Sequence, residues 1–183
     1  MNDEKKLIEL IKNDESLMTI LQAVESLGLH DSWVCAGHIR GKVWDSLNAC
    51  RTPVADIDVI YFDSSDLTVE TEKQLEHQLQ NLLPGLPWSV KNQARMHEKN
   101  GLPPFRSSYD GVAHFPETPT AVAVKMEKNK LLVMAPYGLE DVFHQIVRPT
   151  PMYEAHKPLH IIYQKRMSEK QWNKTWQAIT ITY

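Results

Sequence analysis

The segment DIDVIYF, which begins at Asp56, constrains the fold of this 183-residue chain more than any other. Its β-branched and aromatic residues predict a buried strand. Side chains of a strand alternate between its two faces, so Asp56 and Asp58 point to one side while Ile57 and Val59 point to the other. Two neighbouring carboxylates repel each other, and a bound cation offsets that cost. The pair predicts a Mg²⁺ site, although an isolated pair of this kind is more often a solvated strand edge or a turn cap.

The residues upstream predict a phosphate site beside this strand. A short apolar run, WVCA from Trp33, is followed by Gly37 and by an amphipathic helix. His38, Arg40 and Lys42 lie in the first turns of that helix. Cations at a helix N-terminus oppose the helix dipole, so they are unfavourable there unless an anion binds. A triphosphate docked at the helix N-terminus would explain them.

The order apolar strand, glycine turn, helix and acidic–apolar–acidic strand resembles the nucleotidyltransferase superfamily, which has a polymerase-β-like minimal fold. More closely, the chain resembles a bacterial family of nucleotidyltransferase-like proteins. The matching blocks lie between about Trp33 and Pro149: GHIR at 37–40, VWD at 43–45, DIDVIYFD at 56–63, VKNQARMH at 90–97, FPETPTA at 115–121 and APYGLED at 135–141. The resemblance indicates a reaction class and does not identify a substrate.

The resemblance implies metal-dependent transfer of a nucleoside monophosphate from a nucleoside triphosphate to an acceptor hydroxyl. Asp56 and Asp58 would hold Mg²⁺ or Mn²⁺ and act in catalysis. Glu117 or Asp110 would complete the metal site or act as a base. The remaining candidate residues would contact the substrate: Gly37, His38, Arg40, Asn92, Arg95 and His97.

Two departures from the superfamily pattern leave an alternative open. The usual Gly-Ser after the first strand is Gly37-His38 here, and the strand expected to carry a third carboxylate offers Asn92 instead. The alternative is a catalytically degenerate protein that binds a nucleotide or another ligand on the same fold. A third interpretation is an interaction module that uses the basic, aromatic C-terminal segment.

Composition narrows the function classes further. The net charge is −3 and the isoelectric point is about 6.2, which argues against a protein that binds duplex nucleic acid through a large basic face. The polar start predicts no signal peptide, and no apolar run approaches the ~20 residues that span a bilayer. Cys35 and Cys50 lack CxxC spacing, which favours a reducing, cytoplasmic setting. The nucleotide, the acceptor and the oligomeric state stay open.

The periodicities predict one α/β (α+β) domain over residues 1–183, with a small mixed sheet flanked by helices. N-terminal helices occupy residues 1–30, the core spans 33–149, and a helical extension follows at 152–183. The expected core elements are a helix at 68–83, a strand at 88–92 parallel to the Asp56 strand, a short helix at 107–114, a hairpin of 121–126 with 131–134, and a helix from about 138 through Ile146.

Two segments allow more than one interpretation. Residues 93–111 form either a loop over the site, with their basic groups facing phosphate, or an ordinary surface loop. In the C-terminal extension, Ser168 and Gln171 resemble a capping box, and Trp172 and Trp176 have the spacing of a packed helical face.

Overall fold

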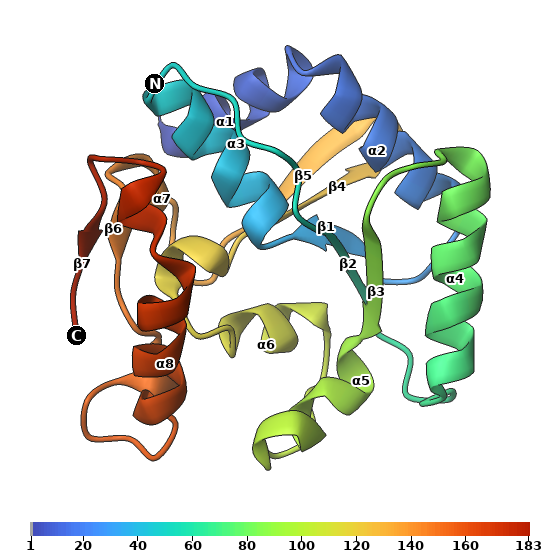
Figure 1. Ribbon diagram of the computed structural model, residues 1–183. Coiled ribbons are helices and arrows are strands. Elements are labelled where there is room, and N and C mark those ends of the chain that lie inside the picture. Colours follow the sequence, from blue (N-terminus) through green and yellow to red (C-terminus); the bar gives the residue numbers. More distant parts are fainter. Residues whose placement is uncertain (1) are drawn as a thin grey trace.

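A mixed five-stranded sheet forms the centre of the protein in a computed structural model that describes residues 2–183 (Figure 1). The strand order is β3–β2–β1–β4–β5. Their bounds are Trp33–Cys35 for β1, Ile57–Tyr61 for β2, Trp88–Asn92 for β3, Ala123–Glu127 for β4 and Lys130–Met134 for β5. β2 and β3 are parallel, as predicted, and the other pairs are antiparallel. β2 is therefore an interior strand with a neighbour on each side.

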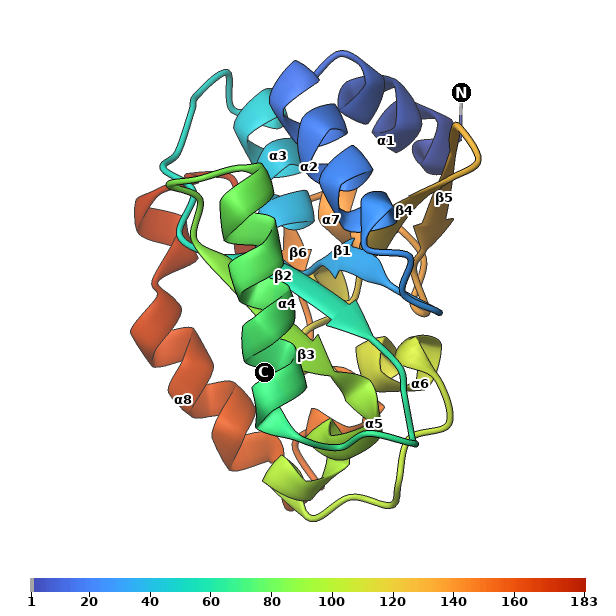
Figure 2. The same cartoon turned by 90° about the vertical axis from the view of Figure 1, so that its right-hand side faces the viewer.

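The larger hydrophobic core lies on the sheet face covered by the first four helices. They are α1 (Asp3–Lys12), α2 (Glu15–Ser26), α3 (Gly37–Leu47) and α4 (Val69–Leu82). Figure 2 shows α4 running along β2 and β3. Ile57 and Val59 of β2 face this core and are fully buried. The helix starts follow from sequence, since Asn2 and Asp14 accept hydrogen bonds from backbone amides of the first turns of α1 and α2.

The opposite face of the sheet carries a smaller apolar cluster that includes Cys35, Ile60 and Val112. Val112 belongs to α6 (Ser108–Ala113), which follows the short helices α5 (Gln93–Met96) and η1 (His97–Asn100). Because side chains alternate along β2, Asp58 lies on this second face together with Ile60. Asp58 therefore faces the side of the sheet that carries the smaller apolar cluster.

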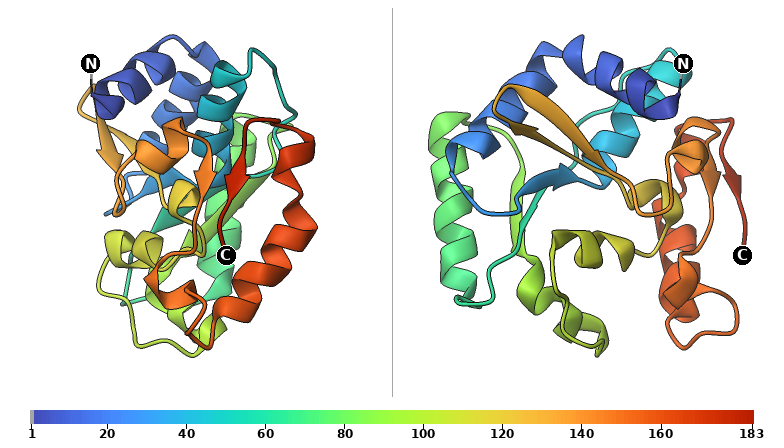
Figure 3. Two further views of the ribbon diagram at one scale, coloured as in Figure 1. Left: turned by 90° about the vertical axis from the view of Figure 1, so that its left-hand side faces the viewer. Right: turned by 180° about the vertical axis from the view of Figure 1, so that it is seen from behind.

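The C-terminal extension differs in two ways from the prediction. The helix expected to run through Ile146 is only α7 (Glu140–Phe143), because Gln145 adopts a positive φ of 55°. Ile146 instead begins β6 (Ile146–Val147), which pairs in parallel with β7 (Thr180–Ile181) near the C-terminus (Figure 3). Three short 3₁₀ turns complete the chain: η2 (Thr118–Thr120), η3 (Pro151–Tyr153) and η4 (Trp172–Lys174).

The capping box expected at Ser168 is wrong, because Ser168 lies inside α8 (His160–Lys170) and its hydroxyl donates to the Lys165 carbonyl. Trp172 and Trp176 are buried as predicted, but they lie in and just after η4 rather than on a helix face. Both pack edge-on against Trp44 of α3, which ties the extension to the core. Within residues 2–183, none of the helices has the length and apolar character that crossing a bilayer requires.

Candidate active site

The turn between β1 and α3 lies beside the acidic pair. Cys35, the last residue of β1, is the register partner of Asp58 in β2. Ala36 follows with φ 58° and ψ −128°, a conformation that is costly for a residue with a Cβ. This strained turn directs the N-terminus of α3 toward the start of β2. Gly37 and Asp58 consequently border the same cavity.

This first cavity has a volume of about 440 Å³. It lies between α3, the start of β2 and the C-terminal segment. Five of the residues proposed to bind metal or substrate line it: Gly37, His38, Arg40, Asp56 and Asp58. The structure therefore brings the predicted phosphate-binding and metal-binding residues to one place.

Asp56 is exposed, whereas Asp58 is partly buried. Burial and the neighbouring charge of Asp56 raise the pKa of Asp58 above its ordinary value. Neither carboxylate forms an ion pair with any residue in the range 2–183. No cationic side chain of residues 2–183 contacts the pair directly, although the charges of Lys170 and Lys91 partly offset that of Asp58. The remaining negative charge suits a divalent cation.

The protein supplies only part of a coordination shell. In the part of the chain that the structure describes, no group of three or more His, Cys, Asp or Glu side chains is placed to hold a metal ion. Mg²⁺ is commonly bound by one or two carboxylates together with substrate phosphates and water. Asp56 and Asp58 fit that mode of binding.

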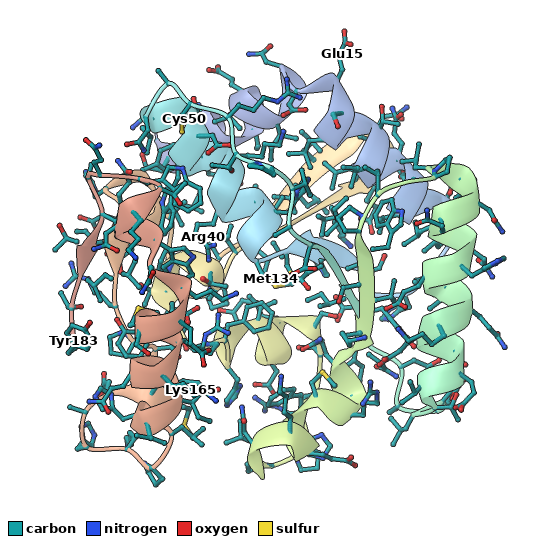
Figure 4. The ribbon with its side chains drawn as sticks, viewed as in Figure 1. Glu15, Arg40, Cys50, Met134, Lys165 and Tyr183 are labelled. Carbon is teal, nitrogen blue, oxygen red and sulfur yellow. The ribbon has the colours of Figure 1, made fainter. Side chains whose placement is uncertain are left out.

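Arg40 is a buried cation, and one of its hydrogen-bond donors is unpaired among the described residues. Its side chain projects from α3 toward the C-terminal segment, as Figure 4 shows, and the residue is 7% exposed. The guanidinium stacks 4.1 Å from the ring centroid of Trp172 and 4.7 Å from that of Trp44, and Nη1 donates to Thr120 Oγ1 at 2.7 Å. Its Nε has no hydrogen-bond partner among residues 2–183. Burial lowers the pKa of Arg40 to about 10, so the group remains charged at neutral pH.

His38 also presents a polar atom without a partner. The residue is 6% exposed, and its buried Nε2 makes no hydrogen bond within the part of the chain that the structure describes. Burial and the charge of Lys42 lower the pKa of His38 to about 4, so its ring is neutral at pH 7. Lys42 itself is paired with Asp14 at 2.6 Å. Arg40 Nε and His38 Nε2 are thus two buried nitrogens without partners in the first turn of α3. Together with the helix N-terminus, which attracts anions, they indicate a ligand-binding site.

Neither proposed third carboxylate reaches the acidic pair. Glu117 is fully buried, and both of its oxygens accept hydrogen bonds from Arg166, the Nη2 to Oε2 distance being 3.2 Å. Asp110 lies in α6, where it accepts from the backbone amide of Arg106 at 3.0 Å, and it does not border the first cavity. Glu117 instead fixes Arg166, and it is Arg166 that lines the cavity.

The three substrate contacts expected from residues 92–97 lie outside the first cavity. The buried Asn92 amide donates to the Asp63 and Asp66 carbonyls and so holds the loop after β2. Arg95 donates from Nε and Nη2 to the buried Glu72 carboxylate, at 2.7 and 2.6 Å. His97 packs edge-on against Phe105. None of these three residues lines the first cavity, so none of them belongs to the proposed nucleotide site.

The sequence-based prediction missed the residues that the C-terminal segment contributes. Arg166 and Lys170 of α8 line the first cavity together with Trp172, and η2 adds Thr120. The basic and aromatic residues of this segment were the sequence feature that could have indicated a contribution to the site. Only the fold shows that the segment returns to cover the start of α3.

The chain belongs to the nucleotidyltransferase family, whose model matches residues 22–181. A solution structure described as revealing a CCA-adding enzyme head domain is 33% identical, with a TM-score of 0.86 over 97% of this chain and 95% of that one. This similarity and the five-stranded mixed sheet establish the polymerase-β-like nucleotidyltransferase fold.

Larger enzymes share the fold at low identity. A CCA-adding enzyme solved with CTP is 13% identical, with a TM-score of 0.58. The match covers 100% of this chain and 44% of that enzyme. An enzyme described as tRNA-processing enzyme complex 3 is 18% identical, with a TM-score of 0.51 over 81% of this chain and 41% of that one. The chain thus spans less than half the length of these two enzymes. A comparison with curated proteins finds no match.

Proposed function

We propose that the protein is a metal-dependent nucleotidyltransferase that moves a nucleoside monophosphate from a nucleoside triphosphate to an acceptor hydroxyl. One observation carries the proposal. Within residues 2–183, the first cavity combines an acidic pair that has no direct ion-pair partner with a buried Arg40 whose Nε lacks a hydrogen-bond partner. A metal–triphosphate complex carries both the cation that the carboxylates need and the anion that the arginine needs.

In this proposal the triphosphate lies at the N-terminus of α3, where the backbone amides that follow Gly37 donate to phosphate oxygens. In this proposal Arg40 donates from Nε, while its stacking on Trp44 and Trp172 and its hydrogen bond to Thr120 hold it in place. Because the protein pre-orders this cation, little conformational entropy is lost when phosphate binds.

Asp56 and Asp58 would hold Mg²⁺ or Mn²⁺. The metal would neutralise charge on the phosphates and on the departing pyrophosphate. The chain's own contribution is to position the triphosphate and to exclude water from part of the cavity with the aromatic C-terminal segment. The larger structural relative solved with CTP supports a nucleoside triphosphate as the class of ligand.

The test is a calorimetric titration of each common nucleoside triphosphate in the presence and absence of Mg²⁺. We expect binding that depends on the metal, and a loss of at least about tenfold in affinity for Asp58→Asn, because that substitution removes one of two charged metal ligands. Asp3→Asn is the matched control, since it removes the same charge from a solvent-accessible pair on α1 that does not border the first cavity. Equal affinity for Asp58→Asn and the native protein would refute the assignment.

Among residues 2–183 no third carboxylate joins the pair in a metal-binding group, which favours a second candidate, a nucleotide-binding protein without transferase activity. It predicts the same metal-dependent binding but no release of pyrophosphate with any acceptor. Measurement of pyrophosphate release therefore separates the two functions once binding is established.

A further inference from the structure

A second cavity, with a volume of about 320 Å³, lies on the other side of Asp58. It is framed by the sheet face that carries Ile60, by α5 and α6, and by α8. Four residues border both cavities: Ala36, Asp58, Thr120 and Arg166. The two cavities therefore meet at the carboxylate to which we assign the metal.

The lining of the second cavity is basic and aromatic. The stacked rings of Phe105 and His114, 4.8 Å apart between centroids, form part of one wall. Lys99 borders the cavity and has no ion-pair partner among residues 2–183. Lys91, by contrast, forms ion pairs with Glu72 and Glu76. Among the described residues that line this cavity, Asp58 is the only acidic one. The cavity thus offers the unpaired charge of Lys99 and an aromatic wall.

We propose that this second cavity is the acceptor subsite, and that the acceptor is a small molecule with a hydroxyl group, negative charge and a planar or apolar portion. The inference rests on the proposed function. The cavity lies at the lower end of the range of about 300–1,000 Å³ that small-molecule sites occupy. A net charge of −3 offers little of the extended positive surface that a nucleic acid backbone requires.

The geometry places the reacting groups in one order. The triphosphate lies in the first cavity, the acceptor hydroxyl enters from the second, and both reach Asp58. The hydroxyl oxygen forms a bond to the α-phosphorus while the bond from that phosphorus to the β-phosphate oxygen breaks. Pyrophosphate leaves through the first cavity, and the hydroxyl proton is released to solvent. Arg166, fixed by Glu117, lies at the junction, where charge develops on the transferred phosphoryl group.

The experiment follows a label on the α-phosphate. The protein is incubated with Mg²⁺ and α-labelled triphosphates, together with a filtrate of small molecules, the RNA fraction or the protein fraction from the cells that make it. We expect label to move into the filtrate. Ile162→Trp, which narrows the second cavity, should reduce this transfer at least tenfold and leave triphosphate affinity unchanged. Ile161→Trp is the matched control, because Ile161 is the preceding residue of α8 and is 67% exposed.

The other outcomes overturn the inference in distinguishable ways. Label in the RNA or protein fraction alone identifies a macromolecular acceptor. A tenfold loss of triphosphate affinity in Ile162→Trp assigns the second cavity to the donor nucleoside. No transfer into the filtrate, with triphosphate binding intact, refutes the acceptor subsite while the proposed nucleotide site stands. Absence of triphosphate binding in the native protein refutes the proposed function itself.

Discussion

The buried pair of Glu117 and Arg166 gives the sharpest test of how the site is held together. Glu117 is fully buried and its partner's side chain is 31% exposed. The substitution Glu117→Gln keeps the size of the side chain but removes its charge. It also turns an NH₂ group toward the guanidinium, so one hydrogen bond is lost and two donors face each other.

The expected loss of stability follows from these contacts. Breaking a buried ion pair costs about 3–5 kcal/mol when the remaining charge is left without compensation. Arg166 regains part of its hydration because it is partly exposed, which places the loss near the lower limit, at about 3 kcal/mol. A domain with stability within the usual range of about 5–15 kcal/mol remains folded after such a loss.

Urea denaturation followed by tryptophan fluorescence measures the effect. With a slope of about 2 kcal/mol per molar urea, the midpoint should fall by about 1.5 M. Glu169→Gln is the control, because its pair with Lys165 lies on the exposed side of α8 and should contribute less than about 0.5 kcal/mol. A loss below about 1 kcal/mol for Glu117→Gln would refute the reasoning that this carboxylate is structural.

Two further predictions concern the first cavity. The pKa of His38 is about 4 in the folded protein against an ordinary 6.5, so the unfolded state alone binds a proton between these values. Titration of His38 should therefore leave the free energy of unfolding unchanged above pH 6.5 and lower it by up to about 3 kcal/mol as the pH drops toward 4. In denaturation curves, the His38→Gln variant should lack this part of the decrease. An identical pH dependence in both proteins would contradict the buried, neutral ring. For Arg40→Gln we expect Mg²⁺–triphosphate affinity to fall at least about tenfold by calorimetry, since a charge-assisted hydrogen bond contributes about 1.5–3 kcal/mol. Unchanged affinity in a folded Arg40→Gln variant would remove Arg40 from the site.

Much of the fold is predictable from the sequence because its signals are local. The strand that begins at Ile57, the helix capped by Asp14 and the strand that ends at Asn92 are each specified by periodicity and by residues at their ends. The parallel pairing of β2 and β3 follows from the helix between them. The pairing of β6 with β7 was not predictable, because each strand is two residues long and the partners come from distant parts of the chain.

The site was predictable only where its residues lie close together in sequence. Gly37, Arg40 and the pair Asp56 and Asp58 come from one continuous unit of strand, helix and strand. The role of Glu117 depends on Arg166, 49 residues further along, and no local pattern links the two. An isolated buried carboxylate has the same sequence signature whether it binds a metal or an arginine, so only the fold separates these roles.

The measurement that tests the central claim most directly is paramagnetic broadening of backbone amide resonances by Mn²⁺. In the presence of a nucleoside triphosphate, we predict that Mn²⁺ broadens signals around Gly37, Ile57 and Asp58 first, because the carboxylate pair and the triphosphate together complete the metal site. Mn²⁺ alone at the same concentration should broaden them far less, since the protein supplies only two carboxylates there. Broadening centred elsewhere in the chain, or equal broadening with and without the triphosphate, would contradict a shared metal–nucleotide site at the start of β2.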